Sequence, residues 1–161
     1  MTGGLQQMKI LIATDFSPVG RKAAFYGYKL AQKSGMDSIF FHAIPQPAKL
    51  LEGYGIKAVI AGSAKAEHKI IEDSARKNLH KLMEAVILEN GKSPDTQIDE
   101  YIAAGDASEE ILKYAKEQSA DMIVIGYKSY SAISEILVGS TAAKVARYAP
   151  CSVLIYRPEK A

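Results

Sequence analysis

KILIATDFSP, residues 9–18, contains a complete junction between a strand and a helix. Its apolar start, with β-branched side chains, is typical of a short buried strand. Ser17 offers a side-chain oxygen that can cap a helix, and Pro18 suits the first helical position. A strand that passes directly into a helix indicates an α/β fold built from parallel strands and crossover helices.

The same order of strand and helix recurs along the chain. Apolar or alternating runs predict further strands at residues 38–44 (SIFFHAI), 96–105 (TQIDEYIAAG), 121–126 (DMIVIG) and 151–157 (CSVLIYR). Amphipathic or capped stretches predict helices at residues 18–34, 63–90, 107–118 and 139–148. This order predicts a doubly wound sheet of about five parallel strands with helices on both faces. We expect 96–105 near an edge and 121–126 in the interior.

Local signals mark the ends and the buried face of these helices. Gly35 and Gly91 are expected to stop helices, and Asp106 with Glu109 resembles a capping box. Residues 45–62 are rich in Pro and Gly and predict a long irregular segment. A stripe on the long helix predicts core packing, through Ile71, Ala75, Leu79, Leu82 and Val86.

Length and composition limit the classes of protein. With 161 residues and 48% hydrophobic content, we expect a single domain over residues 8–161, preceded by a flexible tail at 1–7. A formal net charge of +2 gives little reason to expect a nucleic acid or a membrane as partner, although a local basic patch stays open. A lone cysteine, Cys151, no zinc spacing, no leader and no apolar span predict a soluble, cytoplasmic protein without a metal site.

The loops after the strands are where a ligand is expected, because open parallel sheets bind ligands beyond the carboxyl ends of their strands. Neither GxxxxGK[ST] nor GxGxxG occurs. Instead, Gly126 is followed by Ser129 and then, after nine intervening residues, by Gly139, Ser140 and Thr141. Amide groups at a helix N-terminus that starts with glycine can hold phosphate oxygens.

This pattern resembles the universal stress protein family, whose nucleotide-binding branch carries GxxGx9G[ST] at this place. The resemblance extends from Met8 over nearly the whole chain, through KILIATDFS, FFHAI, GDASEEILKYAKEQSADMIVIG and EILVGSTAAKVARYAPCSVLIYR. It implies a Rossmann-like sheet in the order 3-2-1-4-5, which agrees with the order of elements found above. It also implies a homodimer through the last strand, which an apolar edge strand favours independently.

The resemblance further implies a site for ATP or another adenine nucleotide, with or without Mg²⁺. Asp15 would lie near the ribose or a metal, the backbone at Ala43 would meet the adenine, and Gly126 would line the phosphates. The implied nucleotide-binding residues are Ala13, Asp15, Ala43, Ile125, Gly126, Ser129, Gly139, Ser140 and Thr141.

Ser129 departs from the family pattern, because ATP-binding members have their second glycine there. If this position needs a positive φ, serine costs about 1 to 3 kcal/mol and weakens affinity roughly 5- to 150-fold. If φ is negative, the amide survives and the hydroxyl adds a donor. Tyr127 and Tyr130 are bulky for a phosphate loop, whereas Lys128 and Lys144 offer compensating charge.

Two functions follow from these alternatives. The first is an adenine-nucleotide-binding, dimeric regulatory module of the stress response, and the second is a nucleotide-free module that dimerises and binds an unknown protein. An enzyme is not expected beyond slow ATP hydrolysis, because no motif places a base or a charge stabiliser. His42 is interpreted as a half-buried, hydrogen-bonded side chain, His68 and His80 as solvated, and Cys151 as a packing residue.

Overall fold

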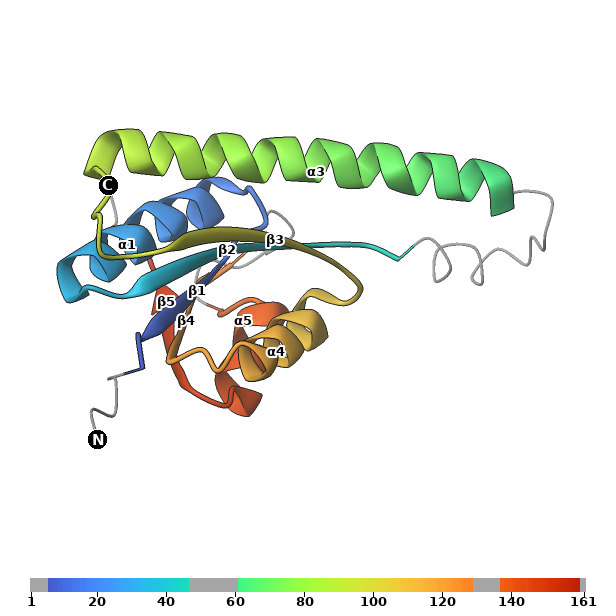
Figure 1. Cartoon of the computed structure of the whole chain (residues 1–161). Coiled ribbons are helices and arrows are strands. Elements are labelled where there is room, and N and C mark those ends of the chain that lie inside the picture. Colours follow the sequence, from blue (N-terminus) through green and yellow to red (C-terminus); the bar gives the residue numbers. More distant parts are fainter. Residues whose placement is uncertain (1–5, 47–60, 129–136, 160–161) are drawn as a thin grey trace.

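The computed structural model describes residues 6–46, 61–128 and 137–159, with only the backbone for 61–64. Its strands form a parallel sheet in the order β3-β2-β1-β4-β5 (Figure 1). The strands are β1 (Lys9–Ala13), β2 (Asp37–Ile44), β3 (Ile98–Ala104), β4 (Met122–Gly126) and β5 (Ser152–Tyr156). The helices are α1 (Pro18–Ser34), α3 (Ala61–Asn90), α4 (Ala107–Glu117) and α5 (Ser140–Tyr148). The predicted strand order is therefore confirmed.

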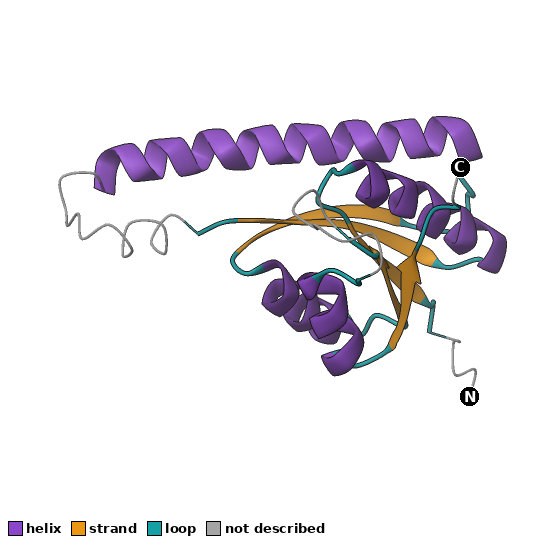
Figure 2. Cartoon of the chain, turned by 180° about the vertical axis from the view of Figure 1, so that it is seen from behind, coloured by secondary structure: helices purple, strands orange, loops and turns teal. Residues whose placement is uncertain are grey.

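Helices cover both faces of this sheet, as the sequence predicts. Helices α1 and α3 pack on one face and α4 and α5 on the other, which Figure 2 shows from behind. Alternation along β2 separates the two cores, because Phe40 is buried under α1 and α3 whereas Phe41 is buried toward α4. The strand β3 lies at one edge, and β4 lies between β1 and β5, so both expectations about strand position are confirmed.

The predicted helix ends are largely confirmed. The Ser17 hydroxyl accepts a hydrogen bond from the Gly20 amide at 3.0 Å, and Gly35 adopts the left-handed φ of 64° that stops α1. Asp106 accepts from the Glu109 amide at 3.1 Å. The Glu109 carboxylate, however, lies 3.5 Å from Lys144 Nζ, so a neighbouring helix engages the side chain expected to complete the capping box.

The long helix differs from its prediction in two respects. It begins at Ala61 rather than at 63, and residues 47–60 of the predicted irregular segment lie outside the described residues. Its N-terminal part extends past the sheet (Figure 1), so Ile71 is 46% exposed and its expected place in the core is wrong. His68 is half-buried rather than solvated, while His80 is exposed and contacts Glu100.

Charged side chains recur along α3, and neither it nor any other described helix is apolar enough over a sufficient length to cross a bilayer.

The cap of α1 generates a stability prediction. Ser17→Ala removes a buried cap hydroxyl and is expected to lower the free energy of unfolding by about 1 to 2 kcal/mol. Ser34→Ala, at an exposed position near the other end of α1, is expected to change it by less than about 0.5 kcal/mol. Urea unfolding of both variants checks this. Equal effects in the two variants would contradict the role of the cap.

Candidate functional site

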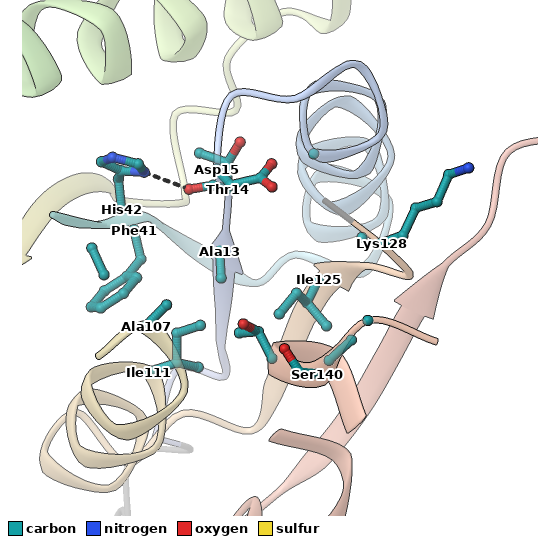
Figure 3. Close-up of a pocket in the computed structure, with 16 residues that line it drawn as sticks. Ala13, Thr14, Asp15, Phe41, His42, Ala107, Ile111, Ile125, Lys128 and Ser140 are labelled. Atoms are coloured by element: carbon teal, nitrogen blue, oxygen red, sulfur yellow. Dashed lines mark hydrogen bonds between the residues drawn. The ribbon is translucent and has the colours of Figure 1, made fainter. Parts of the chain in front are cut away.

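A cavity of about 270 Å³ lies at the carboxyl ends of β1, β2 and β4 (Figure 3). The chain winds from β1 toward β3 on one side and from β4 to β5 on the other, so the cavity lies where the direction of winding reverses. Its volume is close to the lower limit, about 300 Å³, of typical small-molecule sites. The residues that line it are Ala13, Thr14, Asp15, Gly20, Phe41, His42, Ala43, Ala107, Ile111, Ile125, Gly126, Lys128, Gly139, Ser140, Thr141 and Ala142.

Most of the residues implied by the family resemblance come together around this cavity. They are Ala13, Asp15, Ala43, Ile125, Gly126, Gly139, Ser140 and Thr141. Ser129 lies outside the described residues. The sequence analysis missed the wall from α4, formed by Ala107 and Ile111, although the Asp106 cap marks another loop at the same edge of the sheet.

The N-terminus of α5 presents free amide groups to the cavity. The Gly139 amide donates to the Tyr127 carbonyl at 2.6 Å, and the Ala143 amide donates to the Gly139 carbonyl at 2.9 Å. The intervening amides, of Ser140, Thr141 and Ala142, have no acceptor among the described residues. Since all three residues line the cavity, the positive end of α5 can receive an anion there.

The loop between β1 and α1 holds Asp15 at the mouth of the cavity. One oxygen of its carboxylate accepts hydrogen bonds from the Ser17 amide, at 3.0 Å, and from the Ser17 hydroxyl. A Cβ atom at position 20 would lie 2.4 Å from that oxygen, so Gly20 is required for this arrangement. Asp15 therefore organises the start of α1 while its side chain stays exposed.

Gly126 permits a close approach between the end of β4 and the start of α1. A Cβ atom there would lie 3.0 Å from Val19 Cγ1 and 3.5 Å from the Gly20 amide nitrogen. The glycine thus has a packing role in addition to its place on the cavity wall.

His42 is half-buried and hydrogen-bonded, as expected from the sequence. Its Nδ1 lies 2.7 Å from the Thr14 carbonyl, which can only accept, so Nδ1 carries the proton (Figure 3). Its ring packs against Phe16 with centroids 4.3 Å apart. Burial lowers the pKa of His42, while the Thr14 hydrogen bond and the Asp15 charge partly oppose this shift. The imidazole is therefore neutral at pH 7, with Nε2 unprotonated.

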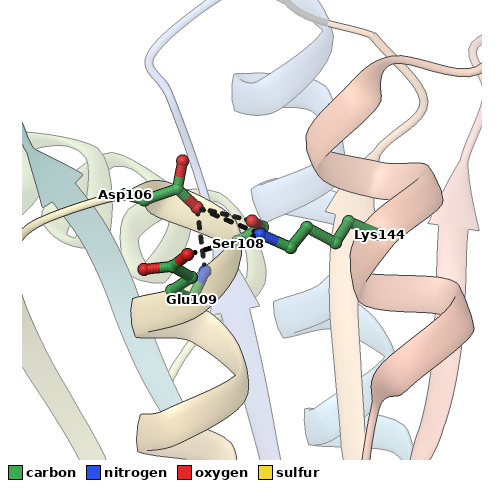
Figure 4. Close-up of polar contacts among 4 residues, drawn as sticks. All are labelled: Asp106, Ser108, Glu109 and Lys144. Atoms are coloured by element: carbon green, nitrogen blue, oxygen red, sulfur yellow. Dashed lines mark hydrogen bonds and ion pairs between the residues drawn. The ribbon is translucent and has the colours of Figure 1, made fainter.

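The two lysines that the sequence offered as compensating charge lie in different surroundings. Lys128 lines the cavity, and its Nζ lies 5.3 Å from the centre of the Tyr127 ring. Lys144 does not line it, because its Nζ lies 3.5 Å from a Glu109 oxygen and 4.0 Å from an Asp106 oxygen (Figure 4). The expectation for Lys144 is thus wrong, since this side chain ties α5 to α4.

Asp106 is the centre of this contact between helices. A hydrogen bond from the Ser108 hydroxyl, followed by one from the Glu109 amide, lowers the pKa of its carboxyl group, with a smaller effect from Lys144. The ionised carboxylate can therefore act both as the cap of α4 and as a partner for α5.

Groups of three or more His, Cys, Asp or Glu side chains that could hold a metal are absent from the described ranges. Asp15 is the one carboxylate among the described lining residues. Cys151 is half-buried beside the core under α4 and α5, and burial raises the pKa of its thiol. Its surroundings agree with a packing role.

Comparison with known sequences adds the family. The model of the universal stress protein family matches residues 8–157. This chain belongs to that family. Universal stress protein YxiE from Bacillus subtilis is 29% identical over 157 residues, which cover 92% of this chain and 98% of YxiE. The sequence resemblance is thereby confirmed.

Solved structures agree with the fold. MJ0577 superposes with a TM-score of 0.74 at 22% identity, covering 96% of this chain and 98% of MJ0577. The universal stress protein from Archaeoglobus fulgidus in complex with dAMP has a TM-score of 0.62 at 21% identity, covering 93% and 98% of the two chains. A universal stress protein in complex with cAMP has a TM-score of 0.62 at 21% identity, covering 94% of this chain and 98% of that protein. At these identities the likeness shows the Rossmann-like fold.

The lowered pKa of His42 predicts a pH dependence of stability. The unfolded chain, with an ordinary histidine pKa of 6.5, takes up this proton at higher pH than the folded chain does. The contribution to the free energy of unfolding is therefore complete above pH 6.5 and is lost as the pH falls below it. Urea unfolding between pH 7.5 and 5.5 should show a smaller loss for His42→Gln than for the natural chain.

Ser74→Gln, at an exposed position of α3 that carries no titratable group, serves as the control and should follow the natural chain. A titration midpoint of His42 above 6.5 by NMR would contradict the interpretation.

Proposed function

We propose that this universal stress protein binds an adenine nucleotide in the cavity and acts as a regulatory module of the stress response. The observation that carries the proposal is the set of amides of Ser140, Thr141 and Ala142 at the cavity wall, which have no acceptor within residues 6–46, 61–128 and 137–159. Amides at the positive end of a helix bind phosphate without any further cation. Lys128 adds a positive side chain on the same cavity.

The remaining walls suit the other parts of a nucleotide. Phe41, Ala43, Ala107 and Ile111 supply an apolar surface for a base. The Asp15 carboxylate lines the cavity and keeps an oxygen beyond the one that accepts from Ser17, which supports a role in binding a ribose hydroxyl or Mg²⁺ held by the phosphates. That related folds hold cAMP and dAMP supports adenine as the base.

We infer a binding and sensing role rather than catalysis. Phosphoryl transfer requires an oriented water and strong stabilisation of charge on the transferred group. Among the described lining residues, Lys128 is the one permanently cationic side chain, and the His42 Nδ1–H donates to the Thr14 carbonyl.

We also infer that the protein acts in the cytoplasm. The half-buried lone cysteine supports a reducing compartment.

We also propose that β5 pairs two chains into a homodimer. It is an edge strand, and the Tyr156 carbonyl turns inward to accept from the Tyr127 amide at 2.9 Å. Alternate residues of a strand turn their backbone groups to opposite sides, so the groups of Val153 and Ile155 turn outward. An unpaired edge of this kind can pair with a second copy about a two-fold axis.

One substitution at the N-terminus of α5 can separate an effect on nucleotide binding from an effect on folding. Ser140→Asp is expected to weaken binding of AMP, ADP and ATP at least tenfold, since its carboxylate competes with phosphate at the helix N-terminus. The same charge favours that helix end by about 0.3 to 1 kcal/mol, so stability should not fall. Calorimetry with and without Mg²⁺, on protein freed of carried-over ligand, and urea unfolding measure the two quantities.

Ser74→Asp is the matched control, because Ser74 is exposed on α3, which packs on the opposite face of the sheet from α5. It should leave nucleotide affinity unchanged. Absence of nucleotide binding by the natural chain would contradict the proposal and favour the nucleotide-free interaction module. If Ser129→Gly then bound nucleotide, the lack of binding by the natural chain would be explained by the serine at this position.

The dimer proposal has its own test. Val153→Pro removes an outward amide without removing a hydrogen bond to β4, so the variant should sediment as a folded monomer while the natural chain sediments as a dimer. Val153→Ala should remain dimeric. A natural chain that is monomeric at high concentration would contradict pairing through β5.

A further inference from the structure

Positive charge is concentrated on α1. This helix carries Arg21, Lys22, Lys29 and Lys33 and no acidic residue. The whole chain has a formal net charge of only +2, so the rest of the chain is net negative. Helix α3, by contrast, mixes its lysines with glutamates and an aspartate. The charge on α1 is therefore a local feature that the overall composition hides.

Three of these four charges, the lysines, lie in a line on one face of α1. Lys22, Tyr26, Lys29 and Lys33 follow one another at steps of four, three and four residues, which is the spacing of one helix face. All four side chains are exposed, and the lysines form no ion pair with described residues. At 1.5 Å per residue this α1 stripe is roughly 16 Å long.

The stripe ends in an open groove beside β5. Lys22 and Tyr26 line this groove together with residues 154–159. The rings of Tyr26 and Tyr156 lie 5.3 Å apart, and Tyr26 is 45% exposed. Arg157 lies at the same end, 4.9 Å from the centre of the Tyr127 ring, and Glu159 is the one acidic residue among the described groove residues.

A row of exposed lysines and an exposed aromatic ring within that row are the two features by which proteins bind single strands of nucleic acid. The cations follow the phosphates, and bases stack on the rings without being read as sequence. A membrane surface would call for exposed apolar side chains among the lysines, and an acidic protein would not require the aromatic pair. The combination therefore favours nucleic acid over these two partners.

We propose that the α1 stripe binds single-stranded nucleic acid without sequence preference. Lys22, Tyr26, Lys29 and Lys33 all lie on α1, and none of them lines the nucleotide cavity, so this activity goes beyond the proposed nucleotide binding and does not depend on it. If the three lysines each contact a phosphate of the nucleic acid, a plot of the logarithm of the affinity against the logarithm of the salt concentration should have a slope of about −2.

Fluorescence anisotropy of a labelled 12-residue oligouridine, at low salt, tests the charge. Lys22→Gln, Lys29→Gln and Lys33→Gln together should lower its affinity at least tenfold. The matched control is Lys69→Gln, Lys77→Gln and Lys81→Gln, which removes the same charge from exposed positions of α3. It should change the affinity less than about threefold.

Stacking has a second pair of variants. Tyr26→Ala should weaken binding at least fivefold, as expected for loss of one base–aromatic stack. Tyr148→Ala removes a tyrosine that is 62% exposed on α5 and should have no effect.

Four outcomes would overturn the proposal. They are no binding to the natural chain at low salt, equal loss in the two lysine triples, no loss in Tyr26→Ala, and displacement of the oligouridine by AMP. Binding of the natural chain to phosphatidylserine vesicles but not to oligouridine would assign the stripe to membranes instead.

Discussion

The pairing of β1 with β4 is the constraint on which the site depends. Ile10, Leu11 and Ile12 of β1 are fully buried and pair in parallel with β4. After these neighbouring strands the chain turns to opposite faces of the sheet, into α1 on one side and into α5 on the other. The divergence opens a crevice between the two loops. Gly20 and Gly126 keep the walls close, because an added Cβ atom would lie 2.4 Å from an Asp15 carboxylate oxygen at position 20 and 3.0 Å from Val19 Cγ1 at position 126.

A single hydrogen bond then sets the chemistry of the crevice. The Gly139 amide is used by the Tyr127 carbonyl, which follows β4 directly, and this contact fixes where α5 begins. The next three amides have no acceptor in the part of the chain that the structure describes, while Lys144 holds α5 to the start of α4 through Asp106 and Glu109. The proposed phosphate site is thus made of backbone, and its position is set by contacts to β4 and α4.

Much of the fold is predictable from the sequence because local and global signals agree. The apolar strands, the Ser17 cap and the glycine stops each specify one element, and the alternation of strand and helix leaves few topologies possible.

Other features depend on tertiary contacts that the sequence does not reveal. The prediction that Ile71 lies in the core is wrong because hydrophobic periodicity does not indicate how far a helix extends past the sheet. The site is predictable as a set of loops, yet the use of the Gly139 amide and the α4 wall depend on tertiary contacts. The contacts of Lys144 depend on tertiary structure for the same reason, since its partners, Asp106 and Glu109, lie at the start of another helix. Overall charge likewise says nothing about the α1 stripe, because a sum over the chain discards where the charges lie.

The central claim is that the free amides at the start of α5 bind a phosphate. Amide proton and nitrogen NMR shifts during titration with AMP, compared with adenosine, test this most directly. The account predicts large shifts of the Ser140, Thr141 and Ala142 amides with AMP that adenosine does not produce. Equal responses to the two ligands, or shifts with AMP that leave these amides unchanged, would contradict it.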